Sequence, residues 1–519
     1  MKKILPSLTL CGIFLLSHAG CRTPEMLPAG QEILTFLRQT AQGNQAPPPK
    51  DLQQEGNWQI DLTLYSQGEI KGSGSGHQKA LYLALEEAVR NTVAPGTDLN
   101  GARFLVSVSG SSGKTFSFVE FNGEGKEITG DAVAIRHLDK NLIRQKTEAG
   151  KHYLLRHMNK EHYGFYKKYD AARNLKGTKL RTIYSASSLY TLMKINALKP
   201  EDPVSRVIPL IADFLLGMQS QESETRGAFH YAYDLKTGTK EPKFVVGTAS
   251  KTIFTLLELY RMTQDSKYLE AAKSAGDWLL AMQNPDGSVI NQKKLKDGQW
   301  VSDTRYSCLY LGQVLSAMSR LYTATSDPRY FVGAKKIAQL SAQRAAKQGY
   351  FMRDEYRLPD DPVPTSWMIM SLLDFYRATH QAEYKEIYLK CAEELLKRQL
   401  RDAGDILNYG RFKGTYATSG NGWINEILGE VLKTCREEGA DCEKYKEAMI
   451  LVSRWLIQNT YSEENTYFLR RPGPALGGLI RNRLEEAVRT DAVCHGVNGY
   501  VTLLGELEEN WTFEVPEKP

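Results

Sequence analysis

Two aspartates, Asp303 and Asp491, stand at the entrances of predicted buried helices and are the first candidates for chemistry. Their helical hairpins are three apart in a predicted ring of six, so we expect the two carboxyl groups to face each other across its centre. Glycoside hydrolysis needs such a pair, one carboxyl as acid and the other as base or nucleophile. Helix N-capping, the commoner role for an aspartate at this position, is the alternative.

The segment 489–500 suits a different reaction. It holds Arg489, Asp491 and His495 within one predicted helix. A lyase or epimerase abstracts a proton next to a uronate carboxylate, and it needs a histidine or tyrosine base beside a neutralising arginine. Glu426, near the start of the preceding buried helix, is a further catalytic candidate.

Arginines and aromatic residues at the same helix entrances are candidates for substrate binding. Guanidinium groups pair carboxylate or sulfate bidentately, and aromatic rings stack on sugar rings, so together they favour an anionic carbohydrate. These candidates are Arg181, Tyr184, Tyr233, Arg305, Trp367, Tyr409, Trp423 and Arg489.

A repeating unit of two helices must position these residues. Tyr268, Tyr330, Tyr384 and Tyr445 each open an amphipathic helix that follows an apolar helix and a polar turn. The apolar, buried helices begin near Tyr184, Thr248, Tyr306, Thr365, Trp423 and Asp491. The amphipathic helices are predicted at 142–158, 207–218, 268–282, 331–344, 384–400 and 445–458. Because the array starts with an outer helix and ends with an inner one, its ends can pair and close a ring.

This array resembles the six-hairpin (α/α) toroids, which include six-hairpin glycosidases and the helical domain of glucuronyl epimerases. The resemblance implies a mainly α fold, with an (α/α)6 toroid over residues 140–512 and one central depression. It also implies a glycoside hydrolase, lyase or epimerase that acts on a carbohydrate through acid/base catalysis. Because toroids host many chemistries and some host none, a non-catalytic glycan- or peptide-binding protein is the alternative.

The run Cys494-His495-Gly496, with Gly499 three residues on, resembles the zinc motif of lanthionine synthetase C-like proteins, which are also toroids. That resemblance implies Cys494 and His495 as zinc ligands and a cysteine at the position that Ile424 occupies. Zinc needs four ligands, or three and a water, so we expect a degenerate site with no metal and no other cofactor. A toroid of this kind is the second alternative.

Residues 55–135 predict a small α+β domain, because Trp58, Ile60, Leu62 and Leu64 alternate with polar residues and a helix follows near residues 80–93. The stretch Leu62–Gly72 before that helix resembles the AMMECR-type domain. The Gly/Ser run that ends at Gly76 predicts a flexible turn, or else an anion-binding helix start.

The N-terminus predicts export. Lys2 and Lys3 precede an apolar run too short to span a membrane, and Ala19-Gly20-Cys21 resembles a bacterial lipobox. We therefore expect a lipoprotein signal peptide at 1–21, lipidation of Cys21, a tether at 22–54, and attachment to a membrane of the bacterial cell envelope. A disulfide between Cys435 and Cys442 would suit that compartment.

Composition excludes little else. The chain has 519 residues, of which 42% are hydrophobic and 24% charged, as in ordinary globular proteins. A net charge of +6 without a basic helix or a nucleic-acid motif gives no reason to expect a nucleic-acid partner.

Overall fold

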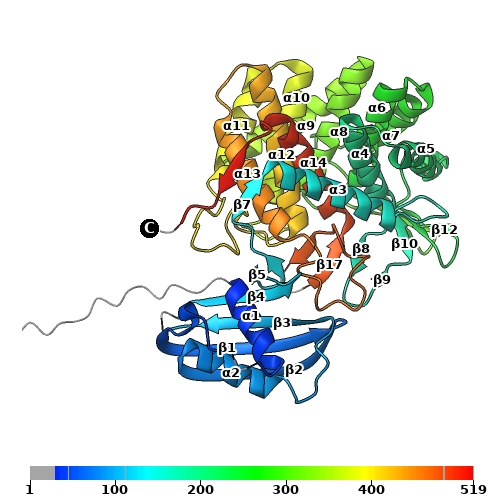
Figure 1. Ribbon diagram of the computed structural model, residues 1–519. Helices are drawn as coiled ribbons and strands as arrows, with labels where there is room; N and C mark the ends of the chain where they lie inside the picture. Colours follow the sequence, from blue (N-terminus) through cyan, green and yellow to red (C-terminus); the bar gives the residue numbers. More distant parts are fainter. Residues whose placement is uncertain (1–29, 45, 112, 483–484, 518–519) are drawn as a thin grey trace, which may run out of the picture.

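The computed structural model describes residues 30–44, 46–111, 113–482 and 485–517. The predicted signal peptide and the predicted lipidation site, Cys21, lie outside these residues. Within them, no helix is long and apolar enough to cross a membrane. Figure 1 shows a large helical domain above a smaller sheet-containing domain.

The large domain is the predicted (α/α)6 toroid. Its outer helices are α3 (Lys140–His157), α5 (Asp202–Gly217), α7 (Ser266–Ala281), α9 (Pro328–Gln348), α11 (Ala382–Leu396) and α13 (Glu443–Gln458). Its inner helices are α4 (Thr182–Leu198), α6 (Val246–Thr263), α8 (Cys308–Thr325), α10 (Val363–Thr379), α12 (Thr418–Glu437) and α14 (Thr490–Glu506).

The inner helices form a closed ring in the order α4, α6, α8, α10, α12, α14, with α14 packed against α4. The last inner helix also packs on the first outer helix α3, as the order of the repeat predicted. Strand β7 (His137–Asp139) pairs with β18 (Thr512–Glu514), which joins the two ends of the domain.

Hydrophobic pattern separates the two kinds of helix. Helix α10 is buried on nearly all sides, whereas α7 buries one face and exposes the other, where Lys273 pairs with Glu270. The inner helices approach closely where glycine permits it. A Cβ on Gly312 of α8 would lie 2.9 Å from the carbonyl oxygen of Trp367 on α10.

Short strands precede three inner helices and fix their entrances. β10 (Lys179–Arg181) leads into α4, β13 (Lys243–Val245) into α6, and β17 (Glu485–Arg489) into α14. These strands belong to three small sheets whose other members are β8 (Lys168–Asp170), β9 (Leu175–Lys176), β11 (Ala232–Asp234), β12 (Thr239–Lys240), β14 (Gln292–Lys296), β15 (Gln299–Asp303) and β16 (Ile480–Asn482).

The small domain is an antiparallel sheet of order β2-β1-β3-β4-β5-β6 with two helices. Its elements are α1 (Gly30–Ala41), β1 (Glu55–Ser66), β2 (Glu69–Ala80), α2 (Leu81–Thr92), β3 (Ala102–Ser109), β4 (Thr115–Phe121), β5 (Glu124–Thr129) and β6 (Ala132–Val133). Helix α1 buries Ile33, Phe36 and Leu37 in the core of this domain. Residues 30–41 are therefore part of the domain rather than of a tether, because their apolar face packs on the sheet.

The Gly/Ser run is neither a turn nor an anion-binding loop but part of β2. A Cβ on Gly72 would lie 2.0 Å from the carbonyl oxygen of Thr92, and one on Gly76 would lie 2.0 Å from that of Ala84. The glycines let α2 lie directly on the strand, which is why every second position of the run carries no side chain.

The two domains contact each other through the loop that follows α13. Tyr65 packs edge-on against Tyr467, and Asn465 donates a hydrogen bond to the carbonyl of Asp131. At the other end of α13, Cys435 and Cys442 form the predicted disulfide, which joins the end of α12 to the start of α13.

Candidate active site

A cavity of about 450 Å³ opens at the N-terminal ends of the inner helices, and all six of these helices contribute to its wall. We call this cavity the basin. It contains six of the residues proposed from the sequence, namely Tyr184, Trp367, Trp423, Arg489, Asp491 and His495.

His495 and Glu426 form a buried pair between the neighbouring helices α14 and α12. His495 Nδ1 lies 2.6 Å from Glu426 Oε2, and the two side chains are 11% and 7% exposed. Burial acts to raise the pKa of Glu426, but His495, Lys251 and Lys194 outweigh it and lower that pKa to about 2. Glu426 is therefore a carboxylate, and it can accept a proton that His495 carries on Nδ1.

Arg489 and Asp491 form a second pair at the entrance of α14. Two hydrogen bonds of 2.9 and 2.5 Å join the guanidinium to the carboxylate, and Arg489 also donates to the Tyr184 hydroxyl at 2.9 Å. Burial acts to raise the pKa of Asp491, but Arg489 outweighs it and the pKa is lowered. Burial raises the pKa of Tyr184, so this phenol keeps its proton.

Asp303 is not in the basin, so the predicted pair of facing aspartates does not form. Its carboxylate accepts hydrogen bonds from Arg305 at 2.8 Å and from the Tyr356 hydroxyl at 2.6 Å. The hydrogen bonds from Arg305 lower the pKa of Asp303. Neither aspartate is an N-cap, because Ser307 caps α8 and Asp491 is the second residue of α14.

Four predicted substrate-binding residues also lie outside the basin. Arg305 is held by Asp303, and Arg181 pairs with Glu241 while stacking 4.7 Å from the centre of the Tyr231 ring. Tyr233 packs against His162 in the β11 sheet.

Tyr409, predicted to bind substrate, is part of a hydrophobic cluster away from the basin. It is buried against Leu451 of α13 and Val515, because the connection between α11 and α12 turns this ring toward the outer helix. Repeat position alone did not show which way a loop side chain turns.

Sequence reasoning missed Lys251, which lies on α6 and contacts the basin. Its ammonium lies 4.3 Å from the centre of the Trp423 ring and 5.3 Å from that of Trp367, and these two rings stack 4.0 Å apart. Burial lowers the pKa of Lys251 to about 8. The available signal was a lone lysine within an otherwise uncharged stretch of a buried helix.

Cations dominate the charged lining of the basin. Asp491 is the one carboxylate in its wall, against Lys167, Lys251, Arg357, Arg481 and Arg489. Arg357, Arg481 and Arg489 each pair with an acid. Within the part of the chain that the structure describes, Lys167 and Lys251 form no ion pair. The basin therefore suits an anionic ligand.

Cys494 points away from His495 and toward α4. Its Sγ lies 3.5 Å from Ser188 Oγ, and burial raises its pKa to about 12. The described residues contain no group of three or more His, Cys, Asp or Glu side chains that could hold a metal ion. The neighbouring Cys494 and His495 thus face different parts of the ring.

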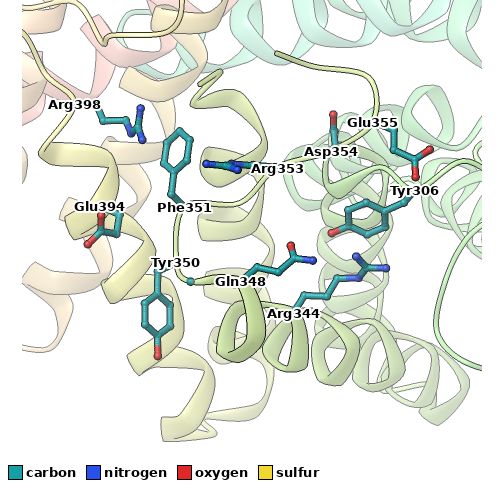
Figure 2. Close-up of a pocket in the computed structure, with 11 residues that line it drawn as sticks. Tyr306, Arg344, Gln348, Tyr350, Phe351, Arg353, Asp354, Glu355, Glu394 and Arg398 are labelled. Atoms are coloured by element: carbon teal, nitrogen blue, oxygen red, sulfur yellow. The ribbon is translucent and has the colours of Figure 1, made fainter. Parts of the chain in front are cut away.

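A larger cavity of about 680 Å³ lies beside the C-terminal ends of the outer helices α9 and α11, and we call it the outer pocket. Figure 2 shows Arg344 beside Tyr306, and Phe351 between Arg353 and Arg398. The guanidinium groups of Arg344 and Arg398 each lie 3.6 Å from the centre of the neighbouring ring. The lining of this pocket includes none of Asp303, Glu426, Asp491 and His495.

The fold is that of six-hairpin glycosidase-like proteins. A cellobiose 2-epimerase from Bacillus thermoamylovorans aligns with a TM-score of 0.56 at 13% identity, over 71% of this chain and 99% of its own. An unsaturated glucuronyl hydrolase specific for heparin gives a TM-score of 0.51 at 13% identity, over 71% and 99%. A GH76 alpha-mannanase from Bacteroides thetaiotaomicron gives 0.52 at 12%, over 70% and 96%.

One protein family matches part of the sequence. The ulvan lyase N-terminal domain matches residues 211–327, which run from within α5 to the end of α8. Among curated proteins, none matches the chain. The matched segment includes Lys251 and Tyr310, which line the basin.

Proposed function

We propose that this protein is a carbohydrate-active enzyme that removes the proton next to the carboxylate of a uronic acid, as a lyase or an epimerase. The observation that carries the proposal is the buried Glu426–His495 pair at a basin lined by cations. The sugar-processing activities named for proteins of the same fold, and the lyase family matched by residues 211–327, support the same class.

His495 is the base in this proposal. Ionised Glu426 accepts the Nδ1 proton and thereby fixes the tautomer and the ring orientation, so Nε2 can take a proton from the sugar carbon. Trp423 packs edge-on against the imidazole, with ring centres 5.0 Å apart, and limits its rotation.

Tyr184 is the acid. Its oxygen already accepts a hydrogen bond from Arg489, so its own proton is available to a ligand in the basin. In a lyase reaction this proton passes to the departing glycosidic oxygen as a carbon–carbon double bond forms. In an epimerase reaction the tyrosine proton is delivered to the opposite face of the carbon from which His495 has taken a proton. Both reactions need a cation to neutralise the uronate carboxylate, and the basin offers two unpaired ammonium groups.

Hydrolysis is less well supported. It needs one protonated carboxyl group as the acid, with a raised pKa. Asp491 in the basin wall and Glu426 behind His495 both have lowered pKa values, because cationic groups lie beside them. Asp303 lies elsewhere and is ionised as well.

The test is activity of residues 22–519 on a panel of uronate-containing polysaccharides that includes ulvan, beside neutral glucans and mannans. A lyase produces ultraviolet absorbance from the unsaturated product, and an epimerase exchanges a sugar proton for deuterium from heavy water. Both signals should disappear in His495→Ala. New reducing ends without absorbance, or retention of a glycan without any reaction, would replace the proposal by a hydrolase or a binding protein, respectively.

We also propose that the protein is exported and anchored to the cell envelope through Cys21. The charged and apolar N-terminal segment supports this, and so does the Cys435–Cys442 disulfide, since such bonds persist in oxidising compartments. Mass spectrometry of the membrane fraction should find a diacylglyceryl-modified N-terminal cysteine. Cys21→Ser should release the protein from the membrane, and a wild-type protein found only in the soluble fraction would refute the anchor.

A further inference from the structure

The floor of the basin is built around the Lys251 side chain. Helix α6, which carries it, lies opposite α12 in the ring, yet its ammonium reaches the face of Trp423 on α12. Lys251 also contacts a much smaller cavity of about 20 Å³ beneath the basin. Its ammonium therefore lies between the two cavities, near the centre of the ring.

Three buried polar atoms at this floor have no hydrogen-bond partner among the described residues. They are Trp423 Nε1, Thr248 Oγ1 and Gln313 Oε1. The residues are 3%, 0% and 5% exposed, and each lines the basin. A buried polar group without a partner is costly to the fold, so each of these three atoms is available for a hydrogen bond with water or with a ligand that enters the basin.

The backbone of α6 is shaped to hold one of these groups. A Cβ on Gly247 would lie 2.1 Å from Gln313 Oε1, so the glycine makes room for the amide. Thr248 is the next residue, and Lys251 lies three positions further along the same helix face. The Thr248 hydroxyl, the Gln313 amide oxygen and the Lys251 ammonium thus come from one small region of the wall.

Within the described chain Lys251 makes no direct ion pair at this place, although the Glu426 carboxylate, which His495 holds, acts on it at longer range. The rings of Trp423, Trp367 and Phe254 surround its ammonium at 4.3 to 5.5 Å. Aromatic faces attract a cation but do not neutralise it. An anionic group of a ligand would do so.

We propose that the floor is the subsite for the uronate carboxylate, with Lys251 as its counter-ion and the Trp423 indole N–H as a hydrogen-bond donor to it. Thr248 and Gln313 bind a hydroxyl group of the same sugar. This assignment deepens the proposed function, on which it rests for the class of ligand. It places the carboxylate at the bottom of the basin, beside the His495 ring that packs against Trp423.

The experiment measures binding of D-glucuronate, D-glucose and glucose 6-sulfate to wild type and Lys251→Met by ligand-observed NMR titration. We expect wild type to prefer glucuronate. Lys251→Met should weaken glucuronate binding roughly tenfold to a hundredfold, the effect of a lost charge-assisted hydrogen bond, and leave glucose unchanged. Equal affinities in the two proteins, or an equal loss for glucose, would overturn the subsite. So would a failure of wild type to bind glucuronate, while a preference for the sulfate would overturn the carboxylate assignment.

Two controls keep the result interpretable. Lys243→Met removes another ammonium stacked on an aromatic ring, 4.5 Å from the centre of Tyr231, but outside the basin lining, and should leave binding unchanged. Thr248→Val is a milder change at the floor, and it replaces Lys251→Met as the test if that variant does not fold. It should weaken binding of all three sugars. Lys251-dependent binding by a protein that shows no reaction would uphold the subsite and refute the lyase or epimerase.

Discussion

The basin and the outer pocket contain the same kinds of residues but differ in how far those residues are exposed to solvent. Both contain arginines, carboxylates and aromatic rings, and the outer pocket is the larger, at about 680 against 450 Å³. In the outer pocket, Arg353 and Glu355 are exposed to solvent, and Arg344 and Arg398 cover ring faces. In the basin, His495 and Glu426 are buried, and three polar atoms lack partners.

From this difference we expect desolvation, rather than cavity volume, to decide which of the two cavities is reactive. Water satisfies an exposed guanidinium or carboxylate and screens its charge, so such a group binds weakly and its pKa changes little. A buried group interacts strongly with whatever enters, because no water competes. The largest effects of mutation should therefore come from the basin, although the outer pocket has the larger volume.

His495→Ala should have the largest effect. Loss of the general base should reduce kcat about a hundredfold to ten-thousandfold on the active polysaccharide. Steady-state kinetics with circular dichroism as the folding control would measure it. Activity within a few-fold of wild type would remove the basin from its catalytic role.

Glu426→Gln should follow. An amide can donate a hydrogen bond to Nδ1, which would place the proton on Nε2 and leave the base in the wrong tautomer. We expect kcat to fall on the order of a hundredfold with a smaller change in KM. Glu430→Gln is the comparison, since Glu430 is a half-buried carboxylate one helical turn away that pairs with Arg377. An equal loss in both variants would show that Glu426 acts through stability alone.

The pH dependence should reveal Lys251. Because burial lowers its pKa to about 8, the ammonium loses its proton above that pH, and glucuronate affinity should fall there. Lys251→Met should show weak binding without this fall. The effect on folding has the opposite sign. The unfolded state binds more protons between about pH 8 and the ordinary lysine pKa, so the free energy of unfolding should rise with pH in this range. A flat binding profile in wild type would contradict the assignment.

Thr248→Val should weaken sugar binding and stabilise the fold. Its hydroxyl is buried without a partner, so replacing it by a methyl group should raise the free energy of unfolding by about 1 kcal/mol while sugar affinity falls. Urea denaturation and the NMR titration would measure the two effects. Destabilisation together with unchanged binding would mean that the hydroxyl has a structural partner rather than a ligand.

Arg353→Gln in the outer pocket should have the smallest effect. The side chain is exposed and forms no ion pair among the described residues. The free energy of unfolding, and the activation free energy that kcat/KM reports, should therefore each stay within about 0.5 kcal/mol of wild type. A tenfold loss of activity would show that the outer pocket takes part in catalysis, and the comparison would then fail.

Much of the architecture could be read from the sequence because it depends on local patterns. The apolar and amphipathic helices alternate with a fixed period, and their order predicted that α14 would close the ring on α3. The tether was the exception. The apolar face of α1 is visible in the sequence, but its partner is a sheet whose contacting strands, β4 and β5, begin 74 and 83 residues after the end of α1 (115−41 and 124−41).

The sequence also placed Arg489, Asp491 and His495 in one segment, and all three line the basin. Only the tertiary structure decided their partners. Glu426 reaches His495 from a neighbouring helix, Lys251 reaches Trp423 across the ring, and Asp303 is held at the rim by Arg305 and Tyr356. The physical reason is that hydrophobic periodicity fixes which face of a helix is buried, whereas the charge state of a buried side chain depends on what the other helices bring to it.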